Sequence, residues 1–366
     1  MPTMPPRAKA RPLSLFALYR FALILTLFLP LAALASSVTG VGIAPIQIND
    51  PVSGKLTDGY VFYPSPQPMH GTTAMGPYNV AAIPDAPAIP GAKPLVVISH
   101  GNGGSRLGHH DLATFLASHG FIVATLNHPK DDFEDTSGVG HIEVLAGRPV
   151  QVKSTISTLL ADPRWKTLID PARIGVAGFS AGGYTSLMVV GAKPDFTRFV
   201  DFCARYPKDD NVCGKLAEFQ TEATKSGLTL RQLMQQRQSQ LNRYGDTADP
   251  RVKAAFVMAP LSLIFDTHSF DTVSAPIYLY YGQNDHVLRP EANARHIQPL
   301  IHTLAGVKEV PKADHWVFLT PCAPVLTKEI NELCIDPPGV DRVKVHEQIN
   351  DDALTFFRKT LDVKDH

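Results

Sequence analysis

Short apolar runs alternate with segments of helical periodicity from residue 95 to the end of the chain, where a last amphipathic helix is predicted over 341–361. Each run has the length of a strand buried on both faces, and the runs cover residues 95–99, 121–126, 173–178, 254–258 and 277–281. The segment after Pro149 shows the helical spacing clearly, with apolar side chains at Val152, Ile156, Leu159 and Leu160. Such alternation predicts the α/β class, with a mostly parallel central sheet flanked by helices.

Two segments depart from this alternation. Residues 36–94 are rich in Pro, Gly and Ala and contain one strand-like stretch at 60–63, so we expect an irregular lead-in. Residues 195–249 interrupt the later pattern with a Gln-rich helix, which begins at a capping box formed by Thr229 and Gln232. We therefore predict a helical, cap-like insertion at about 195–249.

The first 35 residues have the pattern of a secretory signal peptide. Residues 1–20 carry four basic side chains and no acid, residues 21–34 are apolar, and 33–35 read Ala-Leu-Ala before two serines. An uncleaved anchor is the alternative, but the apolar run is shorter than the roughly 20 residues that span a bilayer, and it contains Pro30. We predict cleavage after residue 35, no stable membrane span afterwards, and a periplasmic or extracellular protein.

Composition narrows the range of partners. The 366 residues are 44% hydrophobic, enough for a sizeable core, and 34 basic side chains balance 34 acidic ones. Without residues 1–35, 30 basic side chains remain against 34 acidic ones, so the exported chain is mildly acidic. A nucleic-acid partner is therefore not expected, because nothing in this balance favours phosphate binding.

The four cysteines fall into two neighbouring pairs, Cys203 with Cys213 and Cys322 with Cys334. An even number in an exported chain favours two local disulfides, although four cysteines allow three pairings and four buried thiols are the alternative. Neither pair has the short spacing of a zinc site.

The strongest chemical signal is G-F-S-A-G at 178–182. It follows an apolar strand and precedes a helix, which is the context that a nucleophile elbow requires. In such an elbow a sharp turn exposes the central side chain above the sheet, and the helix N-terminus stabilises negative charge beside it. Ser180 is therefore the candidate nucleophile. A plain glycine-rich turn is the alternative.

A serine nucleophile needs donors for the oxyanion that forms on the attacked carbonyl. We expect one to be the backbone N–H of Ala181, the residue after the nucleophile. The other should come from the glycine-rich loop at 99–104, which leaves the strand at 95–99, and Asn102 is the candidate. His100 in the same loop is interpreted as structural.

An acid and a histidine should follow the serine in chain order. Asp285 ends the apolar strand at 277–281, and His315 follows a last strand expected at 307–310, so both are placed at carboxyl ends of strands. Asp314 is the second choice for the acid, because a sequence neighbour points away from its histidine. The histidines judged less suitable as the base are His268, His286, His296 and His302.

Other polar and aromatic residues carry weaker signals. The His-His-Asp cluster at 109–111 opens a predicted helix, and we interpret it as a solvated helix start rather than a metal site. Trp316 and the tyrosines at 278–281 are candidates for a substrate pocket, with core packing as the alternative.

The order of these motifs resembles the α/β-hydrolase superfamily, and in particular dienelactone-hydrolase-like and platelet-activating-factor-acetylhydrolase-like bacterial serine esterases. The resemblance covers roughly residues 40–360 and is carried by VVISHGNGGS, LASHGFIVATLNHP, DPARIGVAGFSAGGYTSL, YYGQNDHVLRP and ADHW. It implies an α/β-hydrolase catalytic domain over 36–366 that needs no cofactor or metal. It assigns Ser180 as nucleophile, Asp285 as acid and His315 as base, with Asn102 and Ala181 as oxyanion-hole residues. Dienelactone hydrolases carry cysteine where this chain has Ser180, so ester hydrolysis is expected rather than dienelactone cleavage.

The sequence thus predicts an exported serine hydrolase that cleaves small-molecule or lipid-like carboxylic esters through an acyl-enzyme. A phospholipase, lipase or polyester hydrolase would use the same triad on a larger substrate. An acyltransferase would pass the acyl group to an alcohol. A non-catalytic binding protein on this fold is a further alternative, although such a protein has no need of the complete triad.

Overall fold

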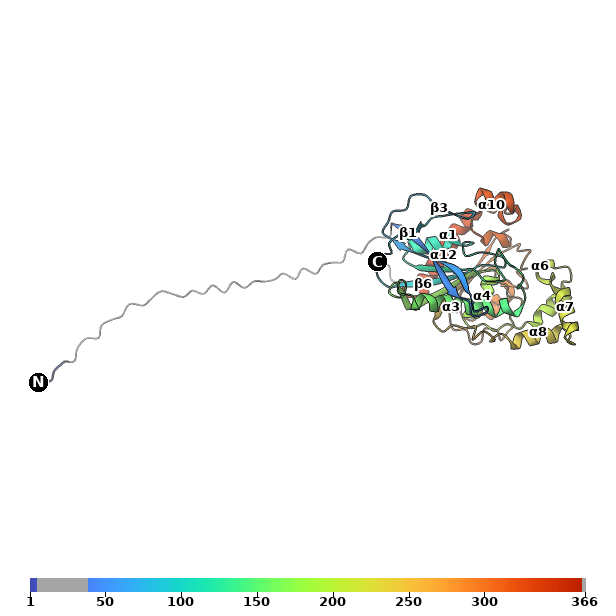
Figure 1. Ribbon diagram of the computed structural model, residues 1–366, viewed down its shortest axis with the longest axis horizontal. Helices are drawn as coiled ribbons and strands as arrows, with labels where there is room; N and C mark the ends of the chain where they lie inside the picture. The colour runs from blue at the N-terminus through green and yellow to red at the C-terminus, as the bar shows by residue number, and fades with distance from the viewer. Residues whose placement is uncertain (5–38, 364–366) are drawn as a thin grey trace. The chain divides into compact units, whose positions relative to one another are not determined.

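Nine strands form one sheet in the computed structural model, which describes residues 1–4 and 39–363 (Figure 1). The strand order is β11-β10-β9-β8-β6-β7-β2-β1-β5. The parallel part consists of β6 (Lys93–Ser99), β7 (Ile122–Leu126), β8 (Ile169–Phe179), β9 (Val252–Met258), β10 (Ile277–Gly282) and β11 (Leu304–Val310). The predicted mostly parallel sheet is confirmed, and its strands coincide with the apolar runs.

The expectation of an irregular lead-in is wrong for much of residues 36–94. β1 (Gly40–Asn49) and β2 (Leu56–Ser65), of ten residues each, form an antiparallel hairpin that joins the sheet at β7. β5 (Ile83–Pro84) adds a short edge, and β3 (Thr73–Met75) pairs with β4 (Tyr78–Val80) in a separate hairpin. Pro45 is tolerated because β5 pairs only with the residues at 42–43, so no ladder bond is lost at the proline.

Helices cover both faces of the sheet and bury two apolar clusters. α1 (His110–Ser118) and α12 (Arg342–Thr360) pack together on one face, and α3 (Gly147–Ala161) and α4 (Ala181–Val189) pack together on the other. The short helices α2 (Ile142–Leu145) and α9 (Ala294–Ile297) complete this second layer. α4 of this second layer begins directly after Ser180.

The segment 195–249 contains α5 (Thr197–Arg205), α6 (Asp210–Cys213), α7 (Leu216–Lys225) and α8 (Leu230–Ser239). We call these four helices the cap; α6, α7 and α8 lie together at one end of the molecule in Figure 1. The capping box of Thr229 and Gln232 is present at α8. A second peripheral segment holds α10 (Pro324–Glu329) and α11 (Asn331–Cys334).

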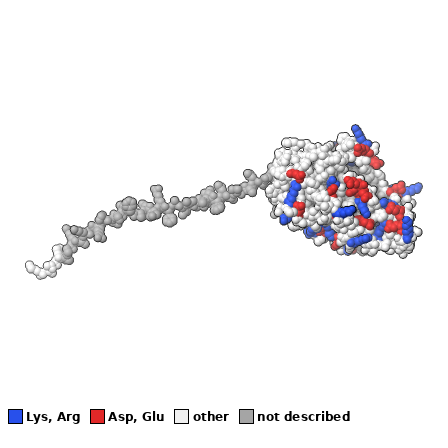
Figure 2. Space-filling view, viewed as in Figure 1, with Lys and Arg blue, Asp and Glu red and all other residues white. Residues whose placement is uncertain are grey.

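Both expected local disulfides are present, Cys203–Cys213 within the cap and Cys322–Cys334 around α10 and α11. In the part of the chain that the structure describes, no helix is long and apolar enough to cross a membrane. The predicted signal peptide lies outside the described residues except for its first four positions. On the face shown in Figure 2, basic and acidic side chains are interspersed.

Candidate active site

Ser180, His315 and Asp285 form one hydrogen-bonded chain at the carboxyl edge of the sheet. His315 Nε2 lies 3.0 Å from Ser180 Oγ, and His315 Nδ1 lies 2.7 Å from Asp285 Oδ2. Since a carboxylate can only accept, Nδ1 carries the imidazole proton and Nε2 is free to accept the Ser180 hydroxyl proton. The second carboxylate oxygen of Asp285 accepts the backbone N–H groups of Val287 and Leu288, which fixes the carboxylate in place.

Each of the three side chains sits just beyond the end of a parallel strand. Ser180 lies between β8 and α4, Asp285 follows β10, and His315 follows β11 as the first residue of a 3₁₀ turn over His315–Phe318. Parallel strands end at the same edge, and this brings together residues up to 135 positions apart. All three residues are buried.

The turn at Ser180 has the strained geometry of a nucleophile elbow. Its φ of 56° and ψ of −116° lie outside the regions that a serine normally occupies. Two glycines allow strand and helix to meet there: a Cβ at Gly178 would lie 2.0 Å from the carbonyl oxygen of Gly182, and a Cβ at Gly182 would lie 1.9 Å from that of Ser99. No larger residue fits either position without displacing backbone.

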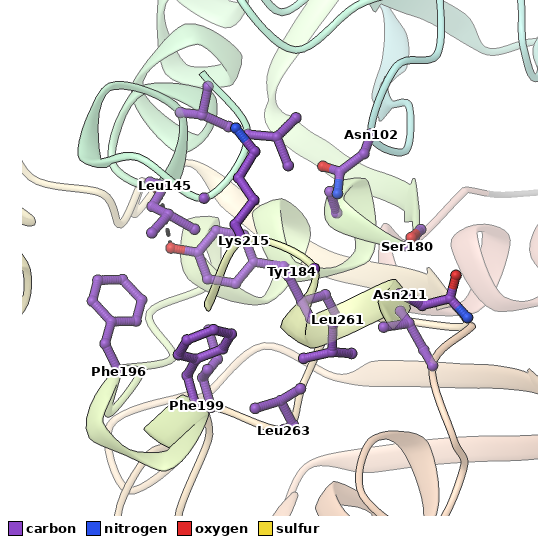
Figure 3. A pocket seen from close by; sticks show the side chains of 18 of the residues that line it. Asn102, Leu145, Ser180, Tyr184, Phe196, Phe199, Asn211, Lys215, Leu261 and Leu263 are labelled. Carbon is purple, nitrogen blue, oxygen red and sulfur yellow. Dashed lines mark hydrogen bonds between the residues drawn. The ribbon is translucent and has the colours of Figure 1, made fainter. Parts of the chain in front are cut away.

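The loop after β6 lies directly against the candidate nucleophile. A Cβ at Gly101 would be 3.2 Å from Ser180 Cβ. The next residue, Asn102, lines the same cavity as Ser180 (Figure 3). Among the described residues, no hydrogen bond takes the backbone N–H of Asn102 or of Ala181. Both N–H groups are available to an oxyanion, and the N-terminus of α4 adds its dipole.

An apolar cavity of about 230 Å³ opens at Ser180 and Asn102 and extends beneath the cap (Figure 3). Apolar side chains make up most of its wall, including those of Leu145, Tyr184, Phe196, Phe199, Phe219, Met234, Leu261 and Leu263. Phe196, Phe199, Phe219 and Met234 come from the segment 195–249, so this segment shapes the cavity beside Ser180.

A second cavity of about 780 Å³ also borders Asn102 and is lined in part by residues 100–109. Its lining includes Trp316 and side chains of the β3–β4 hairpin, of α10 and of α11. Trp316 also packs edge-on against His315. The tyrosines of β10 line neither cavity: Tyr278 stacks with Phe256, and Tyr280 packs against Phe256 at a tilted angle. The pocket interpretation thus fits Trp316, and the core interpretation fits these tyrosines.

Residues 95–327 match the model of the alpha/beta hydrolase family. The chain belongs to this family. The match and the sheet topology together confirm the predicted fold class and superfamily. The family description names no subtype, so the dienelactone-hydrolase-like resemblance stays a prediction.

Two solved structures share the alpha/beta hydrolase fold with this chain at low identity. A ferulic acid esterase from Streptomyces cinnamoneus has a TM-score of 0.54 at 18% identity, over 91% of this chain and 94% of the esterase. A puromycin-hydrolysing peptidase of Mycobacterium tuberculosis has a TM-score of 0.51 at 14% identity, over 87% of this chain and 40% of the peptidase. No curated protein matches the chain significantly. These likenesses establish a common fold and not a common substrate.

In this alpha/beta hydrolase, the acid and the histidines judged less suitable for the triad make other contacts or are exposed. Asp314 caps the 3₁₀ turn through the Trp316 N–H and lies 3.4 Å from His286. His268 pairs with Asp271 at the surface, His296 Nε2 lies 2.8 Å from the Phe265 carbonyl, and His302 is exposed in the turn before β11.

The His-His-Asp cluster at 109–111 packs against α12 and against Phe179 of β8. Asp111 binds His346 of α12 at 2.5 Å, and His109 packs edge-on against Phe179. The cluster does open α1, but His109 is only 3% exposed, so the expectation that the cluster is solvated is wrong.

Sequence reasoning missed a buried polar group beneath the Asn102 loop, made of Asp131, Arg148 and His128. Burial, with a further contribution from Arg148, lowers the pKa of His128 and of the neighbouring His100 well below the usual value. Both imidazoles are therefore neutral. His100 contacts its own loop through Nδ1, which fits the structural role expected of it.

Proposed function

We propose that this alpha/beta hydrolase is an exported serine hydrolase that cleaves carboxylic esters through an acyl-enzyme. The observation that carries the proposal is the Ser180–His315–Asp285 chain at the mouth of an apolar cavity. A proton acceptor held in place beside the serine is what nucleophilic attack on a carbonyl requires, and His315 is held in place by Asp285.

In the first half of the reaction, Ser180 Oγ attacks the ester carbonyl while its proton passes to His315 Nε2. Asp285 accepts the hydrogen bond from Nδ1 and stabilises the imidazolium that forms. The N–H groups of Asn102 and Ala181 bind the carbonyl oxygen as it becomes negative. The imidazolium then gives its proton to the leaving alcohol, and the acyl group remains on Ser180.

In the second half, water takes the place of the alcohol. His315 removes a proton from this water as it attacks the acyl-enzyme, and the same two N–H groups stabilise the second oxyanion. Return of the proton to Ser180 Oγ releases the carboxylic acid. These steps use only side chains and backbone groups of the chain itself.

The cavity beneath the cap favours esters whose acyl group is uncharged, because its walls are mostly apolar, and of limited size, because its volume is about 230 Å³. A lipase, phospholipase or polyester hydrolase would need room for a longer chain or polymer. An acyltransferase would prefer an alcohol to water as the second nucleophile. The substrate series below separates these alternatives.

Export is the second part of the proposal. It rests on the signal-peptide pattern at residues 1–35 and on the two disulfides, since such bonds persist in oxidising compartments. The proposed location is periplasmic or extracellular.

The test compares protein lacking residues 1–35 with its Ser180→Ala variant. Both are assayed with p-nitrophenyl esters from acetate to palmitate and labelled with a fluorophosphonate. We expect labelling to vanish and kcat to fall by about 10⁴-fold or more in Ser180→Ala, because the nucleophile is gone. We expect the wild type to prefer short or medium acyl chains.

Ser186→Ala is the matched control, since Ser186 is a buried serine of α4, the helix after Ser180, and donates only to the Gly182 carbonyl. It should keep both labelling and turnover. A folded wild type that neither labels nor turns over any ester would contradict the proposal and leave the binding-protein alternative. Turnover that rises with added alcohol and yields a new ester would identify an acyltransferase.

A further inference from the structure

A buried ion pair lies beneath the loop that carries Asn102. Arg148, at the start of α3, places Nη1 2.6 Å from Oδ2 of Asp131, and the two side chains are 1% and 0% exposed. Taking both charges out of water costs about as much as their attraction returns, and apolar replacements of such pairs are often equally stable. Stability alone therefore does not account for this pair.

The other hydrogen bonds of the pair hold the loop on both sides of Asn102. Asp131 Oδ1 accepts the backbone N–H of Gly103 at 3.1 Å, and Arg148 Nη2 donates to the carbonyl of His100. One partner thus orients the peptide group that precedes the loop tip, and the other orients the peptide group that follows it.

The peptide group between these two is also fixed. The carbonyl of Gly101 accepts from His100 Nδ1 at 2.7 Å and from the N–H of Gly104 at 3.1 Å. His100 Nε2 accepts the N–H of His128, so the imidazole proton is on Nδ1, as this contact requires. Because a peptide group is planar and trans, a fixed Gly101 carbonyl fixes the opposite direction for the N–H of Asn102.

The same guanidinium reaches the helix that follows the nucleophile. Arg148 Nε donates to Thr185 Oγ1 at 3.0 Å, and Thr185 Oγ1 donates to the carbonyl of Ala181 at 2.8 Å. Nη2 donates also to Ser99 Oγ at 3.2 Å. Although Arg148 borders the cavity, each of its three guanidinium nitrogens is engaged within the chain, so it does not serve as a substrate-binding cation.

We infer that Arg148 and Asp131 are positioning residues that fix the two halves of the oxyanion hole, at Asn102 and at Ala181, relative to each other. The pair clamps the loop around Asn102, and the Thr185 link ties that clamp to Ala181. This inference rests on the proposed function, because the two N–H groups matter only if an oxyanion forms at Ser180. It predicts that the pair acts on the transition state and not on substrate binding.

The first variant is Arg148→Lys. A lysine keeps the charge beside Asp131 but cannot donate in the fixed planar fork that reaches His100 and Thr185. We expect kcat on the preferred p-nitrophenyl ester to fall by about 10- to 100-fold while KM stays within about twofold, because a displaced oxyanion donor weakens only the transition state.

Thr185→Val is the second variant, and it decides the question if Arg148→Lys does not fold. It leaves the ion pair intact and removes only the hydroxyl that links Arg148 to Ala181. We expect kcat to fall by about three- to tenfold, again with little change in KM. Circular dichroism and thermal melting establish that each variant is folded.

A readout that a merely structural role would not move is the affinity for a trifluoromethyl ketone. Its adduct with Ser180 carries an oxyanion, whereas the plain methyl ketone of the same chain length does not form one readily. The inhibition constant of the trifluoromethyl ketone should rise by the same factor by which kcat/KM falls, and that of the methyl ketone should not change.

Arg342→Lys is the matched control. Arg342 forms another largely buried arginine pair, 2.8 Å from Asp336, and lines neither cavity, so its replacement should leave kcat within about twofold. Unchanged kcat in the folded variants of Arg148 and Thr185, or a rise in KM alone, would overturn the inference while normal Ser180-dependent turnover of the wild type upholds the proposed function. Absence of that wild-type turnover would overturn both.

Discussion

His109 shows how a single buried residue couples the stability of this protein to pH. It is 3% exposed, and among the described residues its Nε2 has no hydrogen-bond partner. Burial lowers the pKa of His109 to about 4, against about 6.5 in an unfolded chain. The folded state therefore resists protonation between these two values, while the unfolded state accepts the proton.

The sign follows from this difference. His109 contributes no pH dependence above about pH 6.5, and it lowers the free energy of unfolding progressively as the pH falls toward 4, by an amount on the order of 3 kcal/mol. We expect His109→Gln, which cannot titrate, to lose less stability over this range. Urea unfolding at pH 7, 6, 5 and 4.5 measures the effect.

His268→Gln provides the comparison, because the His268 side chain is 84% exposed and its loss should leave the pH dependence as in the wild type. Other buried histidines, among them His100 and His128, also steepen the curve of every variant. Only the difference between His109→Gln and wild type is therefore interpreted. Parallel curves for these two proteins would contradict the assignment.

At the scale of elements, the agreement between sequence and structure follows burial. The runs at 95–99 and 254–258 identify β6 and β9 because both faces of these strands are covered, which leaves no polar alternation to confuse the pattern. β1 was missed because glycines and Pro45 interrupt its apolar residues, and because its pairing with β2 is a tertiary fact that no local pattern states.

The site divides in the same way. Ser180, Asp285 and His315 were predictable because each follows a recognisable strand, and parallel strands end at one edge. Arg148 and Asp131 were not, since Asp131 lies between Lys130 and Asp132 and Arg148 lies between Gly147 and Pro149, and a charged residue in such a segment is usually exposed. Arg148 is separated from its partners Asp131, His100 and Ser99 by 17 to 49 positions in the sequence, so only the folded structure brings these residues together.

The cap helix α5 provides an element-level prediction. Phe199 of α5 is half-buried and lines the apolar cavity beside Ser180, so Phe199→Ala should lengthen that cavity. Each additional buried methylene is worth about 0.8 kcal/mol, or about fourfold in kcat/KM. We expect the chain-length optimum on p-nitrophenyl esters to move up by roughly two to four carbons.

Phe115→Ala is the comparison for size and burial. Phe115 is a half-buried phenylalanine of α1 that packs on His119 and lines neither cavity. Its replacement should lower stability without moving the optimum. If both variants kept the wild-type optimum, the acyl group would have to bind elsewhere, and the second cavity beside Trp316 would be the next candidate.

At the scale of the whole molecule, neither disulfide joins strands of the sheet. Each disulfide lies in one of two peripheral segments. Cys203–Cys213 joins α5 to α6 beside the first cavity, and Cys322–Cys334 holds α10 and α11 over the second. Both bonds close short loops, of 10 and 12 residues, within segments outside the sheet.

Reduction of the disulfides should therefore loosen the cap and the segment with α10 and α11 before the sheet unfolds. Short loops of this size contribute roughly 2–3 kcal/mol each, which acts locally because neither bond joins the sheet to another element. With thiol present, we expect limited proteolysis to cut first within 195–249 and 320–337, while a core fragment containing β6 to β9 persists. Turnover of the longest accepted ester should fall before that of acetate, since the cap forms the far wall of the cavity.

The paired variants Cys203→Ser/Cys213→Ser and Cys322→Ser/Cys334→Ser separate the two contributions. Only the first pair should change acyl-chain preference, because its cystine braces the helices that line the cavity at Ser180. The second pair should change cleavage near α10 while the acyl optimum stays in place. Loss of the sheet in one step with either bond would instead mean that the peripheral segments and the core fold as a single cooperative unit.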